Sequence, residues 1–344
     1  MAENQTTKLP LAASVTTTLT ANANGEQPPL DRALGINPNS TSRKVRRFVR
    51  NRKATLGLSI LLIFIALALL APVLVPGDPM EFADRPHRAP SAAHLFGTNG
   101  QGQDVFAQVV WGAQRTLFVA FTVGIATTLI GTAVGMTAGY FGGSIDEALS
   151  LIINLFLIIP GLPLIVVIAA FLRPGPATMI FVLTLTGWAW PARVIRSQTL
   201  SLREKDFVSA AVVSGERSTR IIFTEVLPNM TSLITSSAIG STTYALGASI
   251  ALEFLGLGNV SQASWGVILF WAQNNAALLT GAWWTFVPVG LCMALLAFAL
   301  ALLNYSIDEI TNPRLRAASE VSNAVQKLFN KNQHATPVVR GIRE

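Results

Sequence analysis

Long stretches without charged side chains are the feature that most constrains this chain. A helix needs about 20 apolar residues to cross a hydrocarbon core of about 30 Å. Six stretches are long enough, or nearly so: Ala54 to Gly77, Thr116 to Ile145, Ala148 to Leu172, Pro174 to Ala192, Asn229 to Leu252 and Phe286 to Ile307. With 51% hydrophobic and only 12% charged residues, the composition agrees. We therefore expect an all-α polytopic membrane protein with six transmembrane helices.

The positions of Lys and Arg predict the orientation of these spans. The segment Arg43 to Lys53 is dense in cations and holds no acidic residue, and further cations follow the fourth and sixth spans. Cytoplasmic loops of membrane proteins carry such an excess. We expect cytoplasmic N- and C-termini in a multi-pass protein of the cytoplasmic (inner) membrane. The cations have little aromatic interleaving, so nucleic-acid binding is not indicated.

Composition also divides the chain into regions. Residues 1–42 are rich in Thr, Asn, Ala and Pro without apolar periodicity, which predicts a disordered cytoplasmic tail. Residues 43–112 would hold the first transmembrane helix and an extracytoplasmic loop. Residues 113–307 would form a five-helix core that contains a polar segment at 206–229, and residues 308–344 a second cytoplasmic tail.

The polar segment DFVSAAVVSGERSTRIIFTEVLPN lies between the fourth and fifth spans. A short helix would end near Gly215, where the missing Cβ allows a bend. An amphipathic helix would follow, and Pro228 would mark a boundary before the next span. This pattern alone is equally typical of an ordinary cytoplasmic connection between helices.

A-A-x-x-x-G followed by L-P is similar to the "EAA" loop in permease subunits of bacterial ATP-binding-cassette importers. The matching residues are Ala210, Ala211, Gly215, Leu227 and Pro228. Ser209 stands where the family usually has Glu, and Glu225 where this subfamily often has His. The resemblance implies a coupling loop that inserts into a groove of an ATPase subunit. Glu216, Arg220, Ile221 and Phe223 belong to this loop, and we expect Ile221 and Phe223 to contact the groove.

Further segments resemble the C-type permease of the dipeptide/oligopeptide family. HLFGTNGQGQDVFAQVVWGAQRTL matches a family stretch at Gly97, Thr98, Gly102, Asp104, Val105, Gly112 and Ala113. FLGLG, SWG and DEITNPRLR resemble later family segments in the same order, and Asn154 and Asn312 replace family acids. The resemblance covers roughly residues 45–316. It implies a type I importer fold that translocates di- or oligopeptides, although relatives also carry nickel or other solutes.

The resemblance also implies partners. These are a homologous second permease, two ATP-binding-cassette ATPase subunits and an extracytoplasmic substrate-binding protein, assembled in the lipid bilayer. ATP and Mg²⁺ would be bound by the ATPase subunits, because this chain has no G-x-x-x-x-G-K-[ST] motif and no other catalytic motif. We therefore expect no enzyme activity and no cofactor on this chain. We also expect no metal site, because His87 and His94 lack metal-ligand spacing.

Small and polar residues in the spans suggest further roles. Gly131, Gly135 and Gly139 share one helix face, which allows close helix packing within the chain or against another subunit. Pro160 breaks the third span, as suits a helix that lines a cavity. Asn154 would lie within the membrane, either as a hydrogen-bonding link between helices or on the translocation path.

Two other functions remain open on the residues alone. A self-sufficient channel or secondary transporter would also need many spans, but secondary transporters usually contain repeated halves, and the polar segment occurs once. A membrane-embedded transferase would need charged or nucleophilic residues at one depth, and none is apparent.

Overall fold

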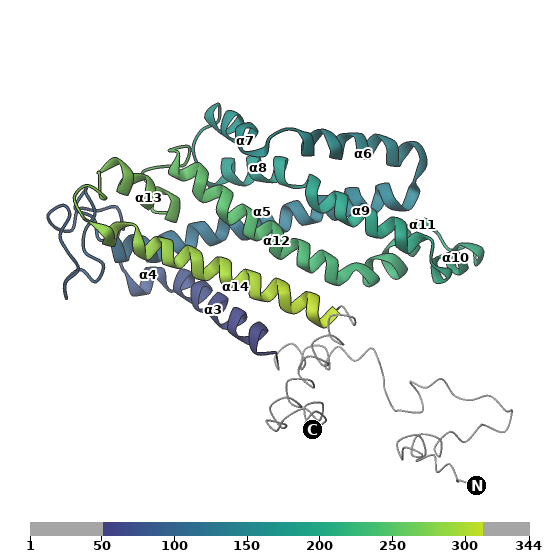
Figure 1. The fold of residues 1–344 in the computed structure, drawn as a ribbon, viewed down its shortest axis with the longest axis horizontal. Helices are drawn as coiled ribbons and strands as arrows, with labels where there is room; N and C mark the ends of the chain where they lie inside the picture. Colours follow the sequence, from purple (N-terminus) through teal and green to yellow (C-terminus); the bar gives the residue numbers. More distant parts are fainter. Residues whose placement is uncertain (1–50, 312–344) are drawn as a thin grey trace, which may run out of the picture. The chain divides into compact units, whose positions relative to one another are not determined.

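The computed structural model describes residues 51–311, and every regular element in this range is a helix (Figure 1). The expected N-terminal tail, Arg43 to Arg50 and the chain beyond Thr311 lie outside the described residues. The elements are α3 (Arg52–Leu69), α4 (Ala71–Leu74), α5 (Val105–Phe141), α6 (Gly143–Ile158), α7 (Gly161–Ala170), α8 (Pro176–Gly187), α9 (Ala189–Arg203), α10 (Asp206–Val213), α11 (Ser218–Ile221), the π-helix η1 (Ile222–Val226), α12 (Leu227–Phe254), α13 (Trp265–Asn274), the 3₁₀-helix η2 (Trp283–Thr285) and α14 (Val287–Thr311).

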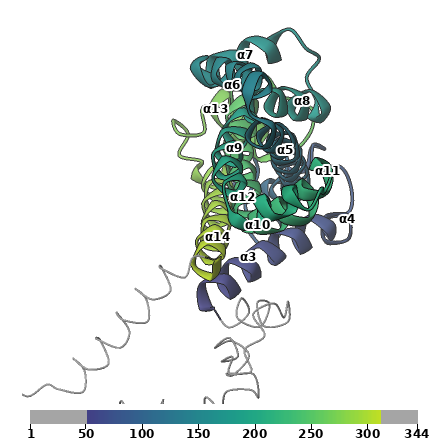
Figure 2. The same cartoon turned by 90° about the vertical axis from the view of Figure 1, so that its right-hand side faces the viewer.

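The long helix α5 lies at the centre of the bundle and packs along both α9 and α12. Seen along the bundle, α3 and α14 pack together on one flank, and α6 and α7 lie on the other (Figure 2). We call the end with residues 75–104 and 255–286 the loop end. The opposite end, with α10 and α11, is the knob end (Figure 1).

The predicted all-α membrane fold is confirmed, but the spans differ in detail from the prediction. Helices α3 and α5, the pair α8–α9 and the segment Trp283–Glu309 are each long and apolar enough to cross a membrane. The pair α6–α7 makes a fifth span if its 84° bend lies within the bilayer. Helix α12 has 28 residues but falls short on hydropathy, because its first half is rich in Ser and Thr. It packs against α5 and α14, so only part of its surface can meet lipid.

Two helix boundaries depart from the sequence prediction. Helix α5 begins at Val105 rather than at Thr116, so the expected boundary between loop and core at residue 112 falls inside it. The third predicted span is broken between Ile158 and Gly161. Pro160 supplies no backbone N–H, and Ile159 before it adopts an extended conformation.

The glycine-containing family segment at the loop end builds the start of α5. Asp104 caps the helix by accepting a hydrogen bond from the Ala107 amide at 3.0 Å. Its second carboxylate oxygen lies 2.6 Å from Nδ1 of His94. Gly97 and Gly102 have positive φ values of 65° and 73°, which a side chain would strain. These residues therefore fold the loop back onto the helix.

Gly131, Gly135 and Gly139 face α9 of the same chain. A Cβ at Gly135 would lie 2.5 Å from the backbone oxygen of Ala192, and one at Gly139 would lie 2.7 Å from Cβ of Thr199. The absence of side chains lets the two backbones approach, and this approach can stabilise helix pairs in lipid. This glycine face therefore packs within the chain, which is one of the two roles expected for it.

We predict that Gly135→Ala lowers the thermal stability of the purified protein by about 1–3 kcal/mol, because the methyl group forces α5 away from α9. Gly247→Ala on α12 is the matched control, since a Cβ there meets nothing within 4 Å. The control should be neutral or slightly stabilising, because Ala favours the helix. Equal melting temperatures for the two variants would contradict this assignment of the glycine face.

Candidate functional site

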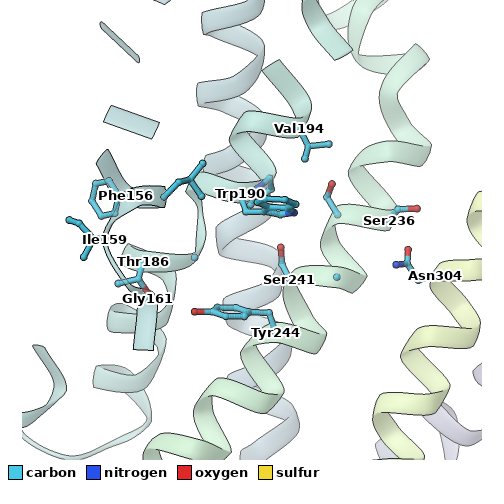
Figure 3. Close-up of a pocket in the computed structure, with 15 residues that line it drawn as sticks. Phe156, Ile159, Gly161, Thr186, Trp190, Val194, Ser236, Ser241, Tyr244 and Asn304 are labelled. Carbon is cyan, nitrogen blue, oxygen red and sulfur yellow. The ribbon is translucent and has the colours of Figure 1, made fainter. Parts of the chain in front are cut away.

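A cavity of about 600 Å³ lies within the membrane-spanning part of the bundle. It lies beside the break between α6 and α7 and beside the junction of α8 and α9 (Figure 3). Its lining comes from six helices and the α6–α7 break, and comprises Phe156, Leu157, Ile159, Gly161, Thr186, Gly187, Trp190, Pro191, Val194, Ser236, Ser237, Gly240, Ser241, Tyr244 and Asn304. Irregular backbone at membrane depth is tolerated where it lines a cavity.

The lining is mainly apolar and carries no charged residue, but several hydroxyls and one amide lie among the apolar side chains. Ser236, Ser237 and Ser241 extend along α12, and Thr186 lies across from them on α8 (Figure 3). The side-chain oxygen of Asn304 on α14 is buried, and no described residue hydrogen-bonds to it. An unsatisfied buried acceptor is unfavourable unless water or a ligand supplies a donor. The cavity therefore suits solutes that form hydrogen bonds. None of its lining residues is charged, although Ser236 donates a hydrogen bond to the Asp308 carboxylate at 2.8 Å.

Tyr244 lies between the start of α7 and the end of α8. A Cβ at Gly187, the last residue of α8, would be 3.5 Å from Cε1 of Tyr244, and one at Gly161, the first residue of α7, would be 3.9 Å from its hydroxyl oxygen. Its side chain extends towards Gly161 and Thr186 (Figure 3). Tyr244 and the serines of α12 were not among the site residues predicted from the sequence. Their spacing on one helix face was the available signal.

The two expected path residues lie beside the cavity rather than in its lining. Asn154 is exposed, and its side-chain oxygen accepts a hydrogen bond from Nη2 of Arg193 at 2.9 Å. Pro160 is the residue before α7, and its neighbours Ile159 and Gly161 line the cavity in its place. The role of Asn154 in this structure is to link α6 to α9.

A second link between α6 and α9 lies closer to the knob end. The guanidinium of Arg196 donates two hydrogen bonds to the Asp146 carboxylate, from Nε at 2.5 Å and from Nη2 at 2.6 Å. Such bidentate pairs are directional and stronger than neutral hydrogen bonds. Together with the Asn154 contact, this pair holds α6 on α9 along one wall of the cavity.

The polar segment folds into a compact structure at the knob end, which we call the knob (residues 206–226). Helix α10 ends in a Schellman motif: the Gly215 amide donates to the Val212 oxygen and the Glu216 amide to the Ala211 oxygen. Gly215 has a φ of 78° and no neighbour within 4 Å of a hypothetical Cβ. Its role is therefore the left-handed conformation of the turn, not a close approach by another residue.

Buried side chains anchor the knob to the bundle. Ile221 is only 1% exposed and packs in a cluster with Val208, Val226, Met136 and Ile195. The prediction that Ile221 contacts a partner is therefore wrong, because its side chain is buried in the chain's own core. The ion pair between Arg220 and Glu216, at 2.9 Å, lies on the surface of the same turn.

Pro228 lies in the first turn of α12, at the boundary predicted before the fifth span. The backbone stays helical from Ser218 into α12, and Leu227 donates its amide to the Ile222 oxygen five residues back. This π-turn shifts the hydrogen-bond register just before the proline, which has no amide to donate. The knob is thus joined to α12 by continuous helix, so displacement of the knob would be transmitted directly to a helix that lines the cavity.

Some apolar residues of the knob face solvent. Val213 is 88% exposed and Phe223 is 66% exposed, and Val212 is also exposed. Ala210 is exposed and Ala211 is half-buried. Exposed apolar groups on an otherwise polar protrusion are typical of a protein contact surface. Phe223 fits the expected contact role, whereas Val212 and Val213 were not singled out from the sequence.

Two segments of the chain match known protein families. Residues 131–317 match the family "binding-protein-dependent transport system inner membrane component". Residues 41–91 match the "N-terminal TM domain of oligopeptide transport permease C". The two matches cover the knob, the cavity and the first transmembrane helix.

Individual relatives agree with the family. The dipeptide transport system permease protein DppC of Bacillus subtilis (strain 168) is 33% identical over 273 residues, covering 79% of this chain and 85% of the relative. The oligopeptide transport system permease protein OppC of Mycobacterium tuberculosis (strain ATCC 25618 / H37Rv) is 34% identical over 260 residues, covering 74% and 88%.

Among solved structures, a chain of the MetNI methionine ABC transporter in an inward-facing conformation matches with a TM-score of 0.50 at 20% identity. The match covers 60% of this chain and 96% of that chain, and it supports the fold alone. The predicted type I importer fold agrees with this likeness. The chain therefore belongs to the family of inner-membrane components of binding-protein-dependent transport systems, as a multi-pass permease subunit related to those of ATP-binding-cassette importers.

Proposed function

We propose that this chain is one of two homologous permease subunits in an importer that carries di- or oligopeptides across the cytoplasmic membrane. The single observation that carries the proposal is the continuous helix from the knob into α12. It joins an exposed contact surface to the wall of a membrane cavity. The names of the dipeptide and oligopeptide relatives support the substrate class.

The knob would be the contact surface for an ATPase subunit. Two ATPase subunits would bind ATP and Mg²⁺ and perform the hydrolysis, and an extracytoplasmic binding protein would deliver the substrate. Nucleotide binding would then favour one arrangement of the spans over another, which is the linkage that coupling requires. The excess of Lys and Arg near the knob end supports a cytoplasmic position for it and for both termini.

The neutral cavity is consistent with transport of peptides. A peptide is zwitterionic and rich in amide groups, so hydroxyls and the Asn304 amide can exchange hydrogen bonds with it as it passes. A path without charged residues binds substrate weakly enough to release it. A self-sufficient channel or secondary transporter has no evident use for the apolar knob surface.

We predict that Gly215→Val reaches the membrane at normal levels but weakens copurification of the ATPase subunits and abolishes peptide uptake. A β-branched residue is strained at positive φ by roughly 1–2 kcal/mol, so the turn between α10 and α11 would change. Gly215→Asn is the matched control, because Asn tolerates this conformation. If Gly215→Val assembles and transports at the wild-type rate, the knob is only a connection.

Contact and anchoring roles in the knob can be separated by two alanine variants. Phe223→Ala should leave the melting temperature nearly unchanged, because the side chain is exposed, but should reduce copurification of the ATPase subunits. Ile221→Ala should destabilise the protein by about 2–5 kcal/mol through the cavity it leaves. Thermal melting and pull-down of both variants test this division. Normal ATPase binding by Phe223→Ala would argue against its contact role.

The cavity can be tested with two glycines of α12 that both have open space around a hypothetical Cβ. Gly240 lines the cavity, whereas Gly247 does not. We predict that Gly240→Phe abolishes uptake of labelled peptides while its membrane level and ATPase copurification stay normal. Gly247→Phe should retain uptake. Unimpaired transport by Gly240→Phe would show that the substrate takes another route.

A further inference from the structure

The connection between α12 and α14 at the loop end is without charge. No Asp, Glu, Lys or Arg occurs between Glu253 and Asp308, a stretch that contains α13, η2 and most of α14. At the same end, residues 75–104 carry Asp78, Glu81, Asp84, Arg85, Arg88 and Asp104. A loop of this length in water would normally hold charged residues, so the two connections occupy different surroundings.

Helix α13 does not cross the membrane, because its 10 residues are too few for a core of about 30 Å. Trp265, Val267 and Ile268 anchor one of its faces in the bundle. The chain beyond α13 then turns outward and presents Leu278 and Leu279, which are 78% and 90% exposed. Exposing the side chains of two adjacent leucines to water is energetically unfavourable.

An apolar groove lies beside these leucines. Its volume is about 540 Å³, and its lining is Phe254, Leu269, Ala272, Gln273, Ala276, Ala277, Leu278, Leu279 and Phe286. Gln273 is the single polar side chain among them. Phe254 ends α12, and Phe286 directly precedes α14. The groove is therefore continuous with the surfaces of two helices of the membrane bundle.

We propose that residues 275–286 form a membrane-embedded tip, with Leu278 and Leu279 in the acyl region of the leaflet at the loop end and a lipid chain in the groove. Trp283 and Trp284 follow the leucines, and Trp rings favour the membrane–water interface. The indole N–H of Trp284 donates to the Thr98 oxygen at 3.1 Å, which ties the tip to the charged loop. The expected ligand is a phospholipid of that leaflet, held through its acyl chain.

The tip can be located by fluorescence. Leu279→Cys is introduced in a Cys292→Ser background, labelled with an environment-sensitive dye, and reconstituted with its copurifying subunits in phospholipid nanodiscs. Ala93→Cys, at an exposed position in the charged loop, is the matched control. The Cys292→Ser protein without a new cysteine corrects for dye bound to other subunits. Emission is then quenched separately with iodide in the buffer and with lipid spin-labelled near the top of its acyl chains.

The proposal expects a blue-shifted dye at position 279 that loses emission with the spin-labelled lipid and resists iodide. The dye at position 93 should show the reverse pattern. Quenching of position 279 by iodide, as at position 93, would overturn the proposal because the tip would lie in water. Protection from both quenchers would also overturn it, because a protein subunit rather than lipid would then cover the leucines.

Discussion

The close approach of α5 and α9 is the contact on which the rest of this structure depends. Three glycines at four-residue spacing remove the side chains that would hold the backbones apart. Apolar burial cannot drive association of helices within lipid, so backbone packing and interhelical hydrogen bonds must hold the bundle together. Helix α9 then positions both functional features. Trp190 and Val194 on α9 line the cavity, and Ile195 packs against the buried side of the knob.

A bilayer requires that backbone polar groups be satisfied, and this constraint determines where the chain can be irregular. The break between α6 and α7 borders the cavity, because Ile159 and Gly161 belong to its lining. Arg193 and Arg196 reinforce that arrangement by binding Asn154 and Asp146 on α6. The cavity is thus a consequence of broken helices held together by polar contacts. It is not simply a space left by poor packing.

The knob combines rigidity with exposure. Val208, Ile221 and Val226 are buried against the bundle, while Val213 and Phe223 remain exposed. A protrusion anchored in this way can transmit a displacement, because a force on its exposed side chains moves the helix that carries them. The π-turn before Pro228 preserves this connection where a proline would otherwise disrupt the helix.

The sequence by itself determined that this is a helical membrane protein with a polar segment between two spans. Charge-free length and the distribution of Lys and Arg are local properties that need no knowledge of contacts. Motif order was sufficient to predict the permease family, and Gly215 could be placed at a turn because few other residues adopt positive φ.

Only the tertiary structure decided which face of each helix is used. Ile221 and Phe223 are two residues apart and both apolar, yet one is buried and the other exposed. Asn154 could have lined a translocation path, but its side chain instead accepts a hydrogen bond from Arg193, which is far away in the sequence. These outcomes depend on which helices become neighbours, and sequence spacing alone does not contain that information.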